Sequence, residues 1–187
     1  MKRIQKYFSF FRLRFVMGLQ YRAAAIGGTV TQFLWGFMEC LAFRTFLEAD
    51  PSAFPMDFSA VMAYTWLREA FFALFTVWHA DNEIFEGIVN GNIAYEMCRP
   101  LSIYHMWFAR TVGIRLANAA VRCVPILAMA FLMPEPFRMT LPHNITAFVL
   151  FVLTMFLGLG VTVAFCMFVY ILSFFTISPK GLRMTFT

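Results

Sequence analysis

The stretch from Ile145 to Ile177 contains no charged residue and consists mainly of Phe, Leu, Val and other apolar residues. A helix needs about twenty apolar residues to cross the hydrocarbon core of a bilayer, which is roughly 30 Å thick. The stretch is longer than that, but two spans with a loop would need about forty residues. It therefore predicts a single span, whose excess length is absorbed by tilt, by extension past the interface, or by a bend near Gly158 and Gly160.

The composition extends this interpretation to the whole chain. Of the 187 residues, 61% are hydrophobic and only 13% are charged, and 25 of them are Phe. A soluble domain keeps about a quarter of its residues charged, because its surface faces water. An ordinary soluble domain is therefore excluded. The sequence predicts an all-α, polytopic transmembrane helical bundle.

Apolar and polar segments alternate in a way that predicts four spans within a transmembrane domain at 23–177. The spans are predicted at 23–47, 58–78, 108–133 and 145–177. In the first span, Gly27, Gly28 and Gly36 make one side of the helix small, which permits close contact with another helix.

The basic residues predict the orientation of these spans. Most of them cluster near the two ends of the chain, at Lys2, Arg3, Lys6, Arg12, Arg14, Arg22, Lys180 and Arg183. Cations that flank apolar spans mark the cytoplasmic side. Loops 48–57 and 134–144 are then external, loop 79–103 is cytoplasmic, and 178–187 is a cytoplasmic tail or the start of a missing fifth span. These flanking cations account for the net charge of +5. Because they are explained by the membrane orientation, no nucleic acid partner is expected.

Residues 1–22 predict an amphipathic helix at the cytoplasmic interface. Apolar side chains recur at helical spacing, at Ile4, Phe8, Phe11, Phe15 and Leu19. Polar side chains lie roughly opposite, which suits a helix in the headgroup layer, in contact with membrane lipid. A basic extension of the first span is the alternative.

Several charged residues fall inside the predicted spans, namely Glu39, Arg68, Glu69, Arg115 and Arg122. An isolated charge at mid-bilayer costs at least about 2.5–3.5 kcal/mol on insertion scales, so such groups usually face the protein interior and pair. Arg115, Asn118 and Arg122 share one helix face. Because Glu69 and Arg122 lie at comparable depths, we predict a Glu69–Arg122 pair. Together with Glu39, these groups form either a structural ion pair or part of a substrate pathway.

Sequence signatures of enzymes are not found. The chain contains no GxxxxGK[ST], GxSxG or HExxH motif, and its four cysteines form no CxxC pair. We therefore expect no catalytic, cofactor or metal site in this chain. If the protein performs work, another polypeptide supplies the energy.

The sequence EGIVNGNIAYEMCRPLSIYHMWFARTVGIRLANAAVRCVPI, at 86–126, resembles the cytoplasmic loop and third span of bacterial ATP-binding cassette (ABC) type-2 exporter permeases. The residues that carry the resemblance are Gly91, Ile93, Ala94, Glu96, Arg99 and Pro100, followed by Trp107, Phe108, Arg110, Arg122 and Pro125. The N-terminal stretch YFSFFRLRFVMGLQYRAAAIGG is likewise similar to the interfacial helix and first span of that family.

The resemblance implies a permease subunit that forms a substrate pathway and couples to a separate ATPase through loop 79–103. Residues 81–96 would form one coupling helix, with Ile84, Phe85, Ile88 and Ile93 as apolar anchors. The implied ATPase-coupling residues are Glu83, Glu86, Ile88, Gly91, Glu96, Arg99 and Pro100. ATP and magnesium would bind to the partner ATPase and not to this chain.

The resemblance also implies the partners and the location of the chain. The partners are an ABC ATPase subunit and either a second permease copy or a distinct permease, in the bacterial cytoplasmic (inner) membrane with the N-terminus in the cytoplasm. Family members have six spans, so four predicted spans indicate a truncated or shortened permease. The alternatives are a four-span membrane scaffold or regulatory subunit with no transport activity, and a small proton-driven exporter.

Overall fold

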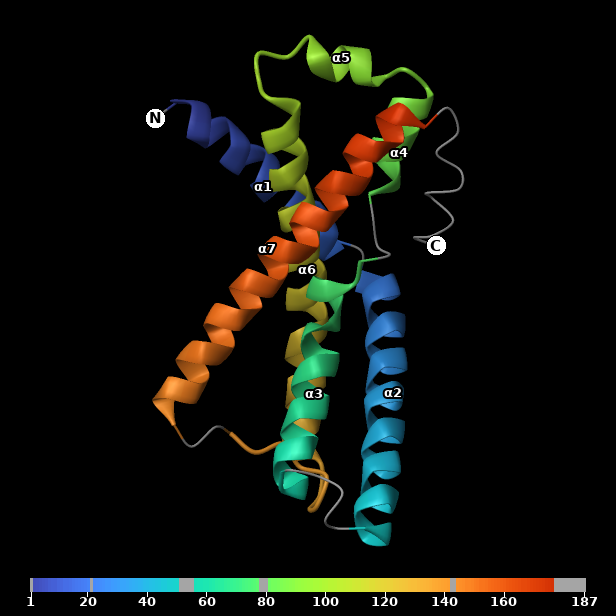
Figure 1. Ribbon diagram of the computed structural model, residues 1–187, viewed down its shortest axis with the longest axis vertical. Coiled ribbons are helices and arrows are strands. Elements are labelled where there is room, and N and C mark those ends of the chain that lie inside the picture. The colour runs from blue at the N-terminus through green and yellow to red at the C-terminus, as the bar shows by residue number, and fades with distance from the viewer. Residues whose placement is uncertain (1, 21, 51–55, 78–80, 142–143, 177–187) are drawn as a thin grey trace. The chain divides into compact units, whose positions relative to one another are not determined.

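The computed structural model describes residues 2–20, 22–50, 56–77, 81–141 and 144–176, and these parts contain helices and no β-strand. The helices are α1 (Lys2–Gln20), α2 (Arg22–Ala49), α3 (Phe58–Phe75), α4 (Asn82–Val89), α5 (Ile93–Met97), α6 (Ile103–Leu132) and α7 (Ile145–Phe175) (Figure 1). The predicted all-α class is confirmed. Most of each predicted span is helical, whereas the predicted segment 178–187 lies outside the described residues.

Two of the described helices are long and apolar enough to cross a membrane. These are α6, with 30 residues, and α7, with 31 residues. A core helix of a soluble protein is mostly buried, but only 28% of the most apolar window of α6 and 17% of that of α7 are buried. The exposed residues of α7 include Phe156, Val161 and Phe168. A large apolar surface of this kind favours a lipid environment.

The described residues divide into two compact units. Unit 1 contains the residues up to Gly18, those between Leu74 and Leu116, and those from Leu153 onward. Unit 2 contains the residues from Leu19 to Ala73 and from Ala117 to Val152. Unit 1 therefore holds nearly all of α1 together with α4 and α5, and unit 2 holds α2 and nearly all of α3.

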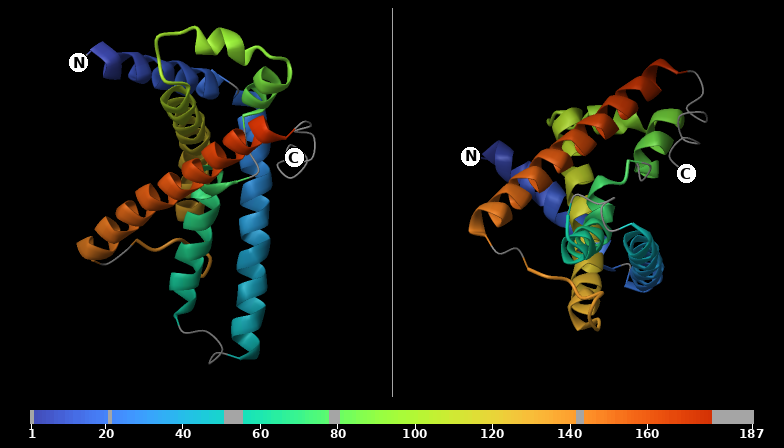
Figure 2. Two further views of the ribbon diagram at one scale, coloured as in Figure 1. Left: turned by 45° about the horizontal axis from the view of Figure 1, so that its top comes forward. Right: turned by 60° about the horizontal axis from the view of Figure 1, so that its bottom comes forward.

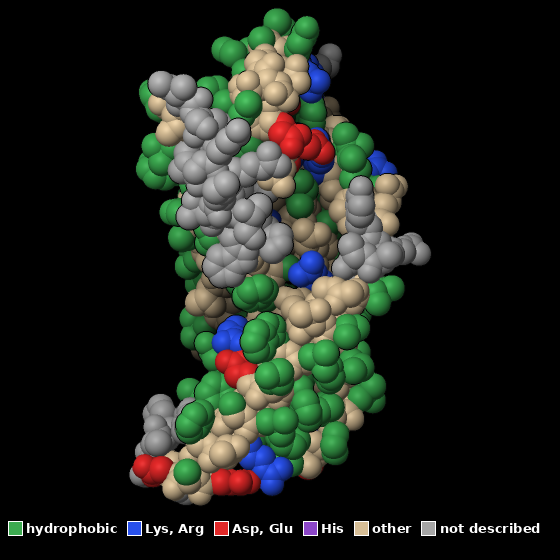
Figure 3. Space-filling model, turned by 90° about the vertical axis from the view of Figure 1, so that its right-hand side faces the viewer, with side chains coloured by type: hydrophobic (Ala, Val, Ile, Leu, Met, Phe, Trp, Pro, Cys, Tyr) green, Lys and Arg blue, Asp and Glu red, His purple; other side chains and the backbone are tan. Residues whose placement is uncertain are grey.

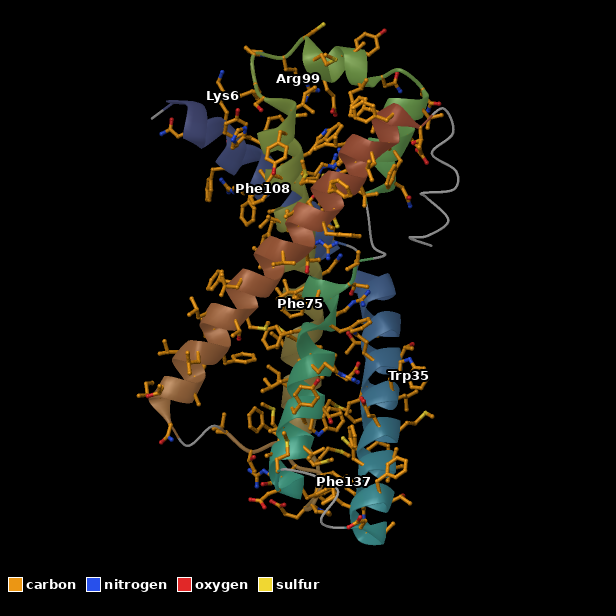
Figure 4. All side chains as sticks on the ribbon, viewed as in Figure 1. Lys6, Trp35, Phe75, Arg99, Phe108 and Phe137 are labelled. Carbon is orange, nitrogen blue, oxygen red and sulfur yellow. The ribbon has the colours of Figure 1, made fainter. Side chains whose placement is uncertain are left out.

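The core of unit 2 forms where α2, α3 and the C-terminal part of α6 meet. Trp66 is fully buried and stacks on Phe33, with 5.3 Å between the ring centroids. Its indole N–H donates a hydrogen bond of 3.0 Å to the carbonyl of Phe137, which belongs to the loop after α6. The ring of Phe137, which is labelled in Figure 4, meets Phe37 and Phe58 edge-on. The loop after α6 thus seals this end of unit 2.

Small residues on α2 allow the close packing that the sequence predicts, but only at some positions. A Cβ atom at Gly36 would lie 3.0 Å from Cγ of Glu69 and 3.2 Å from the Trp66 ring. A Cβ at Gly28 would lie 3.0 Å from the guanidinium of Arg122. Gly27 has no such neighbour within 4 Å. The small face of α2 therefore brings Gly28 and Gly36 against α6 and α3, respectively.

In unit 1, two short helices replace the single helix predicted at 81–96. Helix α4 ends before Asn90, and Gly91 has a φ of 72°, in the left-handed region that favours glycine. The chain then forms α5 and continues into α6, and Figure 2 shows α4 and α5 as an arch beside the start of α6. Helix α6 begins at Ile103, five residues before the predicted span at 108–133.

Helix α1 packs against α6 within unit 1. A Cβ at Gly113 would lie 2.9 Å from the carbonyl oxygen of Phe11, so the two backbones approach closely there. The Tyr7 hydroxyl accepts a hydrogen bond of 3.2 Å from the backbone N–H of Ser102. In contrast, Phe8 and Leu13 are exposed. The apolar side of α1 is therefore divided between packing on α6 and an exposed surface.

Candidate functional site

Arg110 of α6 holds the start of α4 in place. The residue is only 8% exposed. Its Nη2 donates a hydrogen bond of 2.8 Å to Oδ1 of Asp81, and its Nε donates to Oδ2 of the same carboxylate. Nη2 also donates to Oε2 of Glu83. This two-pronged contact with a buried carboxylate fixes both the direction and the position of α4.

Asp81 links this ion pair to the helix itself. Its Oδ1 accepts a hydrogen bond of 3.0 Å from the backbone N–H of Glu83, so Asp81 is the N-cap of α4. Its own backbone N–H donates a hydrogen bond of 2.8 Å to the Tyr170 hydroxyl on α7. One acidic residue thus connects α4 to both α6 and α7.

Aromatic rings continue the contact between these helices. Phe85 is 1% exposed and meets the Tyr170 ring edge-on at 5.3 Å. Trp107 packs against both Tyr170 and Phe174 of α7. Its indole N–H donates a hydrogen bond of 2.9 Å to Oε2 of Glu96 on α5. Both short helices are therefore fixed to the longer helices of unit 1.

Glu83 is shared by two cations. Its carboxylate accepts hydrogen bonds from Arg110 and, at 2.8 Å, from Nη2 of Arg14 on α1. The hydrogen bond from Arg14 lowers the pKa of Glu83 below its usual range, and the charge of Arg110 acts in the same direction. Two partners within unit 1 hold Glu83, but 63% of its side-chain surface is still exposed, so its role as a contact to an ATPase stays a prediction.

We name residues 81–98, with the contacts described above, the α4–α5 segment. Its apolar anchors differ from those predicted, because Ile84 and Phe85 are buried inside unit 1 and Ile88 and Ile93 are half-buried. The exposed apolar residues are instead Val89 (60%), Tyr95 (77%) and Met97 (67%). These three exposed side chains are therefore the apolar contacts that the segment offers to a partner.

The other predicted coupling residues fall into two groups. Glu86, Arg99 and Pro100 are exposed, and Gly91 forms the turn between the two helices. Glu96 is half-buried and bonded to Trp107. The exposed polar residues in and next to the segment therefore include Glu83, Glu86 and Arg99.

In unit 2, Glu39, Arg68 and Glu69 form a second charged site, the Glu39–Arg68–Glu69 cluster. Arg68 Nη2 donates to Oε1 of Glu69 at 2.7 Å and also to Oε2 of Glu39 on α2. The predicted Glu69–Arg122 pair is wrong. Among the described residues, Arg122 forms no ion pair, and its guanidinium lies against Gly28. Glu69 instead pairs with the cation next to it in the sequence.

The remaining predicted intramembrane residues have separate roles. Arg115 is 3% exposed, and its Nη1 donates hydrogen bonds to the carbonyls of Leu74 (3.0 Å) and Thr76 (2.8 Å). The carbonyls at the end of a helix lack partners within the helix, so Arg115 caps the C-terminal end of α3. Asn118 is half-buried in α6.

Several residues of these sites were missed by sequence reasoning. The role of Asp81 had a signal, because an Asp just before a helix with an acid in its first turn marks a helix start. The role of Tyr170 had none, because this residue lies among apolar residues in the sequence. No group of three or more His, Cys, Asp or Glu residues in the described parts is placed to hold a metal ion.

No family model, curated protein or solved structure matches this chain. Functional inference therefore depends on the two sites themselves and on the resemblance in the sequence.

Proposed function

We propose that this chain is the membrane-spanning permease subunit of an ABC-type exporter, located in a bacterial inner membrane. In this proposal, the chain contributes to a substrate pathway and receives mechanical work from a separate ATPase through the α4–α5 segment. ATP and magnesium bind to that ATPase, and this chain contains no catalytic residue. The observation that carries the proposal is the firmly held α4–α5 segment with its exposed apolar side chains.

A coupling element needs two properties, and the α4–α5 segment has features that suit both. It needs a surface for a partner, and Val89, Tyr95 and Met97 are exposed. Exposed aromatic residues and methionine are enriched at protein interfaces. It also needs rigid connections to the helices that move. Arg110 connects the segment to α6, Tyr170 connects it to α7, and Arg14 connects it to α1.

The mechanism follows from these connections. Nucleotide binding closes a pair of ATPase subunits, and each ATPase moves the α4–α5 segment that is docked on it. Because the segment is tied to α6 and α7 by buried contacts, the displacement reaches those helices instead of being absorbed by a loose loop. A second permease subunit completes the pathway, and a substrate shifts the equilibrium between conformations only by its differential affinity for them.

Capture of the partner tests this proposal. A tagged chain, cross-linked in its native membrane and purified, should retain an ATPase with a Walker motif. The variant Tyr95→Ser/Met97→Ser should retain at least about tenfold less, because exposed anchors of this type each contribute about 2 kcal/mol or more to binding. Tyr104→Ser is the matched control, since Tyr104 is also exposed but lies on α6.

Two results would contradict the proposal. One is equal recovery of the ATPase with the double variant and with the control, which would place the docking surface elsewhere. The other is recovery of a sensor or enzyme and no ATPase, which would favour the four-span scaffold or regulatory subunit.

A further inference from the structure

A cavity of about 570 Å³ lies in unit 2 beside the Glu39–Arg68–Glu69 cluster. Its lining includes Gln32, Trp35, Glu39, Arg68, Glu69 and Phe72, all from α2 and α3. Figure 3 shows acidic and basic side chains meeting within a largely hydrophobic part of the surface of this unit. The cavity thus combines a charged group with apolar walls.

The charges of the cavity do not balance. Two carboxylates, Glu39 and Glu69, face one guanidinium, that of Arg68, and both accept hydrogen bonds from the same Nη2 atom. The cluster carries a net charge of −1 when all three groups are ionised. In apolar surroundings, an excess charge is costly unless a charge of opposite sign lies nearby. The cavity therefore favours an occupant with positive charge.

Gln32 provides an independent indication of a ligand. Its side chain lines this cavity and is only 6% exposed, and neither Oε1 nor Nε2 has a hydrogen-bond partner in the described parts of the chain. A buried amide without partners costs about 1–3 kcal/mol. Both amide atoms lie beneath the wall of the cavity, so a ligand with N–H groups would pair with Oε1 of Gln32 once the side chain turns toward it.

Aromatic side chains complete the cavity. Trp35 is 63% exposed and Phe72 is 37% exposed, so part of each side chain is accessible from the cavity. The face of an aromatic ring attracts organic cations, and the apolar body of a ligand gains from contact with the same ring.

A second copy of this chain is the competing occupant. If the same face of two copies met in a symmetric dimer, two clusters of charge −1 would lie close together, and like charges across an interface cost several kcal/mol. The charge therefore argues against a second copy at this face and in favour of a cation.

We propose that this cavity binds an amphiphilic organic cation with N–H groups, and that such cations are the substrate class of the exporter proposed above. The carboxylate of Glu39 attracts the cationic centre, Gln32 accepts a hydrogen bond, and Trp35 and Phe72 contact the apolar body. The transport part of this inference rests on the proposed function, whereas binding does not.

Ethidium is a suitable probe, because it is a fluorescent, planar organic cation with aromatic amino groups. Its binding to the purified full chain in lipid nanodiscs, without ATPase, is measured by fluorescence anisotropy. We expect saturable binding that the anionic dye 8-anilinonaphthalene-1-sulfonate does not displace. Glu39→Gln should raise the Kd about tenfold or more, because it removes a charge close to the ligand in a site of low dielectric constant. Gln32→Leu should also raise it.

Glu48→Gln is the matched control, because it neutralises an exposed acid of the same helix that lies outside the cavity. Its Kd should equal that of the wild type. Far-ultraviolet circular dichroism establishes that each variant is folded. The inference is overturned if ethidium does not bind, if the anionic dye displaces it, or if Glu39→Gln and Gln32→Leu bind it as tightly as Glu48→Gln. Loss of ATPase capture with intact ethidium binding would instead overturn the proposed function alone.

Discussion

Replacing Arg110 by methionine is expected to release the α4–α5 segment from the rest of unit 1. Arg110 and Asp81 each keep only 9% of their side-chain surface exposed. Removal of one partner from a buried ion pair costs about 3–5 kcal/mol, because the other charge remains buried without compensation. Hydrogen exchange of the α4 and α5 amides should therefore accelerate by about two to three orders of magnitude, and capture of the ATPase should fall.

Two further variants make this result specific. Arg12→Met removes an exposed cation from α1 and should leave the exchange of α4 and α5 unchanged. Arg110→Met/Asp81→Asn should restore part of the protection, because asparagine still caps α4 but leaves no buried charge. If Arg110→Met exchanges like the wild type, the ion pair does not hold the segment and the coupling mechanism loses its connection to α6.

Replacing Arg68 by methionine should destabilise unit 2. The variant leaves Glu39 and Glu69 facing each other without the cation that both now contact, and Glu69 keeps only 8% of its side-chain surface exposed. Breaking a buried pair costs about 3–5 kcal/mol, and the partial exposure of Arg68 places this case at the lower end of that range. Thermal unfolding in detergent, followed by circular dichroism, measures the loss.

Arg44→Met is the control for this second prediction. Arg44 forms an exposed pair with Glu48 on α2, and such pairs contribute about 0.3–0.5 kcal/mol. Arg68→Met/Glu69→Gln should recover most of the loss, because it removes the buried carboxylate as well. Equal unfolding temperatures for Arg68→Met and Arg44→Met would show that the cluster does not stabilise α2 against α3.

The helices of this protein were predictable because long uncharged runs leave few alternatives. The end of α7 at Phe175 lies within two residues of the predicted end at Ile177. The break between α4 and α5 was not predicted, although it falls at the sequence NGN within the single helix expected at 81–96. Helix α4 ends there because Gly91 adopts a left-handed backbone conformation, which does not continue a right-handed helix.

The side-chain contacts were only partly predictable. Comparable depth made Glu69 and Arg122 reasonable partners, but depth does not give the direction of a side chain around its helix. Arg68 reaches both Glu69 and Glu39, and the small surface at Gly28 receives Arg122 instead. The opening of the cavity beside Gln32 depends on how α2 and α3 pack, which no pattern in either helix specifies alone.

Cys98 provides the most direct test of the central claim that the α4–α5 segment lies in the cytoplasm and couples to an ATPase. It is exposed just after α5, whereas Cys40 and Cys166 are buried and Cys123 is half-buried. A membrane-impermeant maleimide should label the wild type in inverted inner-membrane vesicles but not in intact cells, and Cys98→Ser should abolish that labelling. Labelling of Cys98 in intact cells would contradict the cytoplasmic location, and with it the coupling to an ATPase.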